Sequence, residues 1–179
     1  EEKKKTLQKL NKCLSKKRYV RLLRKKGSFE GVSTGFVVGL SDTFLLLQAA
    51  DDFRVLGYQT FPISTIKHVR RNKGDKIVES IIEKEGLLGK VGIKYNIDLS
   101  DWRSLSESVM ATKLTVISEC EHPKIGSFCI GKIKQVNNKS ISIRYFNVQG
   151  ELDSEDTINN FKNITNLRFD DHYANVFSK

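Results

Sequence analysis

The sequence is poor in the residues that usually punctuate or cross-link a fold. Its 179 residues include two prolines, three cysteines, one tryptophan and one methionine. A sparse, odd set of cysteines is typical of reduced thiols rather than of a disulfide framework, so we expect a cytoplasmic protein. No apolar run approaches the roughly 18 residues that a membrane-spanning helix needs, and the sequence therefore predicts no membrane partner.

Motifs that carry catalysis are also missing. The chain has no P-loop, no glycine-rich dinucleotide fingerprint and no nucleophile elbow. Its acidic pairs, such as Asp51-Asp52, lie in segments expected to be turns, where aspartate is favoured by local hydrogen bonds. Cys120, His122 and Cys129 have neither the number nor the spacing of ligands that a zinc site needs. We therefore expect no enzyme, no metal site and no cofactor.

A pattern that occurs twice is the main feature that is present. Residues 35–69 and 126–169 each contain short apolar runs separated by glycine, aspartate, asparagine or serine. Two central glycines lie 18 residues apart in the first copy and 19 residues apart in the second. Short strands broken at this spacing predict two small, strongly bent antiparallel barrels in tandem.

The expected fold is mainly β with helices, an α+β protein in four parts. The parts are a basic N-terminal helix at 1–17, a first barrel at 18–73, a helical connector at 74–112, and a second, diverged barrel with a short C-terminal segment at 113–179. In the first copy we expect strands at 19–24, 30–40, 43–49, 53–61 and 64–70. In the second we expect strands at 114–117, 127–136, 139–146, 149–153 and 164–169, with a turn or short helix at 155–162. The connector is predicted to form helices at about 75–85 and 100–111, with Trp102 packed between the barrels.

The positive charge of the chain is concentrated near its N-terminus. The formal net charge is +10, and residues 1–26 hold twelve lysines or arginines and two glutamates, while the rest of the chain holds 19 basic and 19 acidic residues. A dense row of positive charge on a neutral body is typical of a surface that binds a polyanion. The candidate phosphate-binding residues are Lys16, Lys17, Arg18, Arg21, Arg24, Lys25 and Lys26, and a second cluster holds Lys67, Arg70, Arg71 and Lys73. If the first and last strands of the barrel are neighbours, the two clusters form one patch.

Exposed aromatic rings are a second means of binding nucleic acid, because bases stack on them. Most aromatic residues of this chain lie in apolar runs, which favours a place in the core. Tyr58 and Tyr145 are the two that we expect to be exposed, and Tyr58 joins the candidate nucleic-acid-binding residues.

Residues 19–70 resemble a known family in the order of their glycines and apolar runs. The features that carry the resemblance are 20–22, Gly27, 35–39, Asp42, 44–47 and 61–69. This order resembles the Sm-like fold of the Sm, LSm and Hfq proteins, in which an N-terminal helix precedes five bent strands, and it is also similar to the pattern of other small SH3-like barrels. Uridine-binding members carry asparagine after the aspartate and Arg-Gly in the second motif, whereas this chain has Leu45, Leu46 and Phe61-Pro62. The resemblance therefore implies the fold and a preference for RNA, but not the base-binding pocket.

The sequence thus predicts a non-enzymatic protein that associates with RNA or another nucleic acid through a basic arm on a small-barrel scaffold. Recognition is expected to be mainly of the phosphate backbone. The alternative is a protein-interaction or regulatory module that uses the barrel edges or the groove between the barrels. Sm-like barrels assemble through edge strands, and two fused barrels satisfy one pair of edges internally, so we expect a monomer or dimer.

Overall fold

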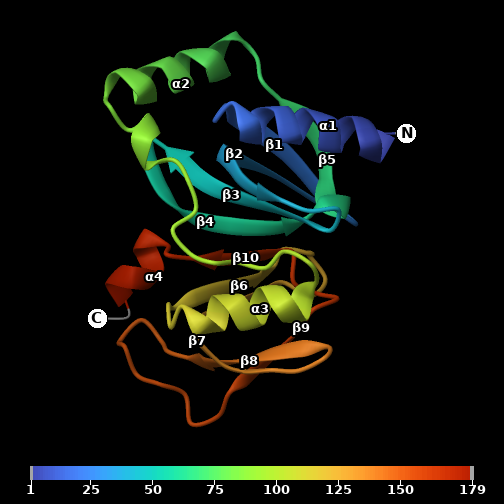
Figure 1. Ribbon diagram of the computed structural model, residues 1–179. Coiled ribbons are helices and arrows are strands. Elements are labelled where there is room, and N and C mark those ends of the chain that lie inside the picture. The colour runs from blue at the N-terminus through green and yellow to red at the C-terminus, as the bar shows by residue number, and fades with distance from the viewer. Residues whose placement is uncertain (1, 178–179) are drawn as a thin grey trace.

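A computed structural model describes residues 2–177 of the chain (Figure 1). The N-terminal half contains, in chain order, α1 (Glu2–Ser15), β1 (Tyr19–Lys26), β2 (Phe29–Leu40), β3 (Phe44–Asp51), β4 (Arg54–Pro62), the 3₁₀ turn η1 (Ile63–Thr65), β5 (Ile66–Arg70), α2 (Lys73–Lys84) and the 3₁₀ turn η2 (Leu88–Lys90). The C-terminal half contains α3 (Trp102–Ala111), β6 (Val116–Cys120), β7 (Ser127–Val136), β8 (Ser140–Tyr145), β9 (Thr157–Asn160), β10 (Asn166–Phe169) and α4 (His172–Phe177).

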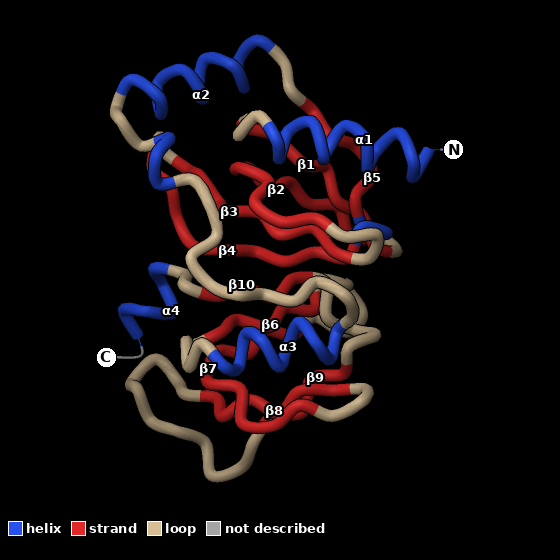
Figure 2. Tube along the Cα trace, in the orientation of Figure 1, coloured by secondary structure: helices blue, strands red, loops and turns tan. Residues whose placement is uncertain are grey.

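The ten strands form one open antiparallel sheet, which Figure 2 shows in red. Their order is β5-β1-β2-β3-β4-β10-β6-β7-β8-β9, so each half repeats the same arrangement of its fifth, first, second, third and fourth strands. The halves are joined where β4 pairs with β10, and Gln59 lies opposite Arg168 in that register. The α+β class is therefore confirmed, whereas two separate tandem barrels are not, because backbone pairing runs without a break from one half into the other.

Helix α1 is part of the core of the first half rather than a loose basic arm. Its residues Leu10 and Cys13 are buried and pack in one cluster with apolar residues of β1 and β5, such as Val20 and Val69. Leu7 and Leu14 flank them on the same face. The spacing of these leucines gives α1 one apolar stripe, which lies on the sheet while the lysines remain outside.

Tryptophan 102, at the first turn of α3, lies between the two halves as expected. Its ring meets Phe44 of β3 edge-on at 4.8 Å between centroids, and stacks on Phe161 of the second half at 5.7 Å. Asp101 begins the helix, since its side chain accepts a hydrogen bond from the Ser104 amide at 2.8 Å. The connector is thus a packed element that fixes α3 across the junction.

Local structure follows the expected pattern closely in the first half and less closely in the second. The five strands of the first copy and both connector helices lie within two residues of their expected bounds. In the second copy the expected strand at 149–153 is wrong, because the fourth strand is β9. The side chain of Asn147 accepts hydrogen bonds from two amides of its own loop, and Gly150 has φ +79°, so this segment forms a turn with a single bridge, between Phe146 just after β8 and Leu152, rather than a strand.

None of the helices within residues 2–177 has the length and apolar character needed to cross a membrane.

Candidate nucleic-acid interface

The two predicted basic clusters lie side by side because β5 pairs antiparallel with β1. Arg21 lies directly opposite Arg70 in this register. Helix α1 runs alongside, and the Lys9 ammonium donates a hydrogen bond to the backbone carbonyl of Val69 in β5. Figure 1 shows α1 lying across the strands β1 and β5. Arg21 and Arg70 are therefore neighbours, while Lys67 lies farther along β5, where it lines a pocket with Lys3 and Thr6 of α1.

Six of these cations form no salt bridge with any carboxylate of the described residues: Lys26, whose ammonium donates to a backbone carbonyl, and five others. We define the α1–β5 basic surface as Lys16, Lys17, Arg18, Lys67 and Lys73. The four lysines are exposed and Arg18 is half-buried. Cations without a carboxylate partner keep their full charge for an external anion, whereas Arg21, Arg24, Lys25, Arg70 and Arg71 are paired with acids.

Three arginines of the predicted clusters are held by two acids of α2. Asp75, which is 2% exposed, accepts hydrogen bonds from Nε and Nη2 of Arg70, both at 3.1 Å, and lies 3.7 Å from Nε of Arg21. Arg71 donates to Glu79 at 2.7 Å, and Glu79 also accepts the Tyr19 amide. These pairs fix the arginines and partly neutralise them, so they border the basic surface.

Asp75 also takes part in the cap at the start of α2, as the third residue of the helix. Its carboxylate accepts the Asn72 amide at 2.9 Å while the Asn72 side chain accepts the Asp75 amide at 3.0 Å, which forms a reciprocal capping box. Burial by itself raises the pKa of Asp75, but the hydrogen bonds from Arg70 and Asn72 and the charges of Arg70 and Arg21 together outweigh burial. The pKa of Asp75 is therefore lowered.

Replacing Asp75 with asparagine is expected to destabilise the fold by about 1–3 kcal/mol at neutral pH, since charge-assisted hydrogen bonds are lost. A carboxyl whose pKa is lowered on folding contributes stability above its ordinary pKa of about 4, and loses it as pH falls through the folded pKa. Thermal unfolding from pH 7 to pH 2 checks this. The difference in Tm between the wild type and Asp75→Asn should decrease towards zero as the pH is lowered. Asp52→Asn, in an exposed turn, is the control; a difference that stays constant with pH contradicts the role of Asp75.

Arg24 is not available to bind phosphate. It is 3% exposed, and its guanidinium donates to both oxygens of Glu121, each at 2.8 Å, and to Ser33 Oγ at 3.1 Å. It also lies over the ring of Phe61 at 4.1 Å from the centroid. Arg24 therefore joins the first half to the second through an internal ion pair and does not belong to the basic surface.

The expectation that Tyr58 is exposed is wrong. Its side chain is 1% exposed, its ring stacks on Phe169 at 5.2 Å, and its hydroxyl donates to the carbonyl of Gly92 at 2.8 Å. The cause is the pairing of β4 with β10, which places Tyr58 in the middle of the sheet rather than at an edge. Tyr145 is half-buried.

The remaining two candidates, Lys25 and Lys26, lie at the end of β1. Lys25 is exposed and pairs with Glu30 at 2.8 Å. The Lys26 ammonium donates to the backbone carbonyl of Lys162 at 2.8 Å, which brings the β1–β2 turn against the segment that follows β9. Lys26 thus extends the basic region from the first half towards the second.

A cleft in the second half adds basic residues that sequence reasoning missed. The Trp102 cleft, about 730 Å³ in volume, is lined by Asp101, Trp102, Arg103, Asn138, Lys139, Asn160, Phe161 and Lys162. Arg103 donates to Asn138 at 2.9 Å and to Glu107 at 2.8 Å, while no salt bridge with a described residue involves Lys139 or Lys162. The Asn137-Asn138 turn was the only local signal, because isolated cations in a neutral segment do not stand out.

Metal binding has no support within residues 2–177. No group of three or more histidine, cysteine, aspartate or glutamate side chains there is placed to hold an ion. Cys13, Cys120 and Cys129 are all free and buried.

A comparison of the chain with protein-family models, with curated proteins and with solved structures finds no match.

Proposed function

We propose that this protein is a non-enzymatic nucleic-acid-binding protein that uses the α1–β5 basic surface, with RNA as its preferred class. One observation carries the proposal. Chain segments 16–18, 67 and 73 place five cations around β1 and β5, and none has a carboxylate partner among the described residues. Cations without a carboxylate partner are suited to phosphate binding, because bound cations replace the counterions condensed on the nucleic acid.

The geometry favours recognition of the backbone over recognition of sequence. The lysines of the basic surface are exposed point charges without a rigid hydrogen-bonding frame. The lysine ammonium binds phosphate as a point charge. It lacks the planar, bidentate hydrogen-bonding geometry with which an arginine guanidinium recognises base edges. The Trp102 cleft, where Lys139 and Lys162 surround half-buried Trp102, supplies a place for a nucleotide next to the Lys26 contact. Binding should accordingly be sensitive to salt and weakly specific.

The preference for RNA rests on the Sm-like resemblance. The resemblance is supported by the order of elements, since α1 is followed by five antiparallel strands and the same strand order recurs in the second half. We infer that each half corresponds to one small-barrel unit and that the two units are fused through β4 and β10. The three free, buried cysteines support a reducing compartment, the cytoplasm, as the site of action.

The test is binding of labelled single-stranded RNA, single-stranded DNA and duplex DNA at about 50 mM salt, where phosphate contacts are strong. The variant replaces Lys16, Lys17, Lys67 and Lys73 with alanine. Its matched control replaces four other exposed lysines, Lys84, Lys94, Lys132 and Lys134, and so has the same net charge. We expect the first variant to lose affinity and the control to keep most of it. Absence of binding to all three ligands, or equal losses in both variants, would overturn the proposal. Deleting residues 1–17 is no substitute, because Leu10 belongs to the core.

A further inference from the structure

The sheet formed by the described residues has two edge strands, β5 and β9, and the edge at β9 has a counterpart within the fold that is already paired. In the first half, the fourth strand β4 has β10 as its outer partner. In the second half, β9 occupies the same place in the strand order, and within residues 2–177 it pairs with β8 alone. In the first half, the fourth strand β4 is therefore extended by an added antiparallel strand, β10. The corresponding strand of the second half, β9, has no such added strand among the described residues.

The two ends of the sheet differ in how they are protected. Strand β5 carries Lys67, His68 and Arg70, and a carbonyl of this strand already accepts a hydrogen bond from Lys9 of α1. Strand β9 reads Thr-Ile-Asn-Asn and has neither charge nor proline. Proteins usually guard edge strands with lysine, proline or a covering element, so an unguarded edge is suited to pairing with an added strand.

Apolar side chains surround the edge. Ile125, Phe128 and Ile158 are 50%, 49% and 66% exposed, and all three line one cavity of about 420 Å³. Large apolar residues gathered at one exposed site are unusual on a surface that faces only water. Ile158 lies on β9 itself, so a strand paired with β9 would pass directly beside this cavity.

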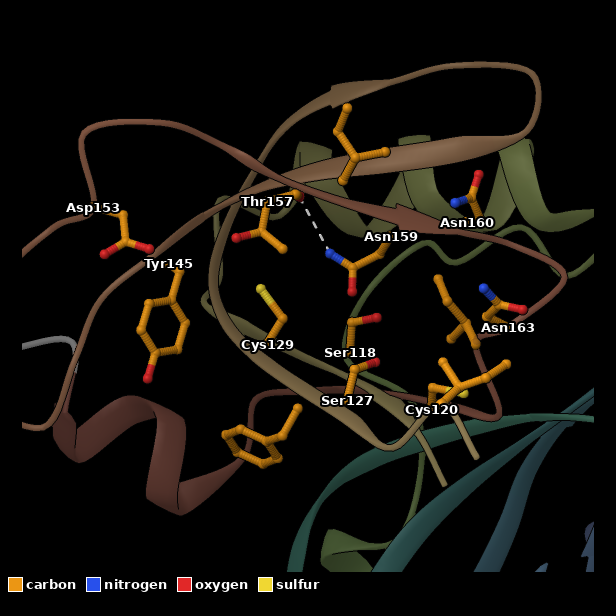
Figure 3. Close-up of a pocket in the computed structure, with 14 residues that line it drawn as sticks. Ser118, Cys120, Ser127, Cys129, Tyr145, Asp153, Thr157, Asn159, Asn160 and Asn163 are labelled. Carbon is orange, nitrogen blue, oxygen red and sulfur yellow. Dashed lines mark hydrogen bonds between the residues drawn. The ribbon is translucent and has the colours of Figure 1, made fainter. Parts of the chain in front are cut away.

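The floor of the cavity is polar and incompletely satisfied. Figure 3 shows Ser118, Cys129 and Asn159 converging on its interior. Ser118 is 1% exposed, and its Oγ has no hydrogen-bond partner among the described residues. A buried hydroxyl without a partner costs free energy that a bound polar group would recover. An apolar rim above such a floor fits a side chain with an apolar body and a polar tip, such as tyrosine.

The loop before β9 is acidic, which indicates the charge of a segment that could bind at this edge. Residues 151–156 include Glu151, Asp153, Glu155 and Asp156 and no basic residue. Among the described residues, Asp156 is the one of these four acids that has a cationic partner, Arg144. Asp153 lines the cavity, so negative charge lies next to the free edge. We propose that β9 and this cavity bind an extended, basic segment of a protein partner, which adds to the sheet as a strand and inserts one large side chain into the cavity.

The experiment uses four capped peptides of about seven residues, the length of an ordinary strand. Each alternates lysine with one of valine, isoleucine, phenylalanine or tyrosine, so that the large side chains share one face. Binding to the full chain is measured by fluorescence anisotropy and by amide hydrogen exchange. We expect at least one peptide to bind with a Kd below about 1 mM, a weak but measurable affinity, and to slow exchange of the amides at 157–160. Tyrosine is expected to be preferred, and Ser118→Ala to reduce that preference.

Two controls separate strand addition from attraction by charge. The same peptide methylated at alternate backbone nitrogens keeps its charge but cannot pair along β9, and should lose binding. Ile158→Lys should lower affinity at least tenfold, roughly 1.4 kcal/mol, while Ile77→Lys, on the exposed face of α2, should not. Failure of all four peptides, binding of the methylated peptide, or equal effects of the two lysine variants would overturn the proposal. So would self-association that Ile158→Lys abolishes, because the edge would then belong to a second copy of the chain.

Discussion

Replacing Arg24 with alanine is expected to lower the free energy of unfolding by about 3–5 kcal/mol, because removal of one partner leaves the other charge of a buried pair uncompensated. Arg24 is 3% exposed, and both of its terminal nitrogens donate to Glu121, 97 residues further along the chain. Glu121 in turn accepts a hydrogen bond from Thr165 at 2.7 Å. The substitution would therefore disturb the contact between the halves as well as the first half itself.

Urea unfolding followed by far-ultraviolet circular dichroism measures this effect. Lys25→Ala, one residue along β1 and exposed, is the matched control and should change stability by less than about 0.5 kcal/mol. The double variant Arg24→Met with Glu121→Met removes both charges and should recover much of the loss, since a buried ion pair contributes little net stability over apolar residues of similar size. A loss below about 1 kcal/mol in Arg24→Ala would show that the pair is not a junction between the halves.

Arg24 also illustrates which properties of a residue can be predicted from the local sequence and which cannot. The sequence places Arg24 in a basic run of β1, and composition alone gives no reason to separate it from Lys25. Its burial depends on Glu121 and on the ring of Phe61, which only the three-dimensional fold brings to it. Charge clustering can thus be predicted from sequence, whereas the availability of each charge depends on distant partners.

Some of the strands could likewise be predicted from the local sequence, and others could not. Alternating apolar residues and turn signals locate β1 to β5 because those strands have buried faces that the pattern records. Strand β9 was missed since it reads Thr-Ile-Asn-Asn, and its one large apolar residue, Ile158, faces solvent. The pairing of β4 with β10 has no local signal at all, because it joins segments about a hundred residues apart. That pairing is what buries Tyr58 and turns two expected barrels into one sheet.

Salt dependence gives the second large expected effect. Each phosphate contact contributes about 0.7 to the slope of log affinity against log salt for a single strand. If Lys16, Lys17, Lys67 and Lys73 each contact one phosphate, alanine at all four positions should reduce the magnitude of the slope by about 2.8. Between 50 and 200 mM salt, the wild type should then lose about 50-fold more affinity for single-stranded RNA than the variant loses.

This measurement separates direct contact from the general field of the protein. The control with alanine at Lys84, Lys94, Lys132 and Lys134 has the same net charge, so long-range attraction is reduced equally, and this attraction is largely screened beyond about 10 Å at 0.1 M salt. Only lysines that contact a phosphate directly displace a condensed counterion and so contribute to the slope. A slope that falls in the basic-surface variant and is retained in the control assigns the contacts to α1, β5 and their flanking residues. Equal slopes in the wild type and both variants would mean that these lysines only solubilise the protein, and that binding, if any, occurs through another surface such as the Trp102 cleft.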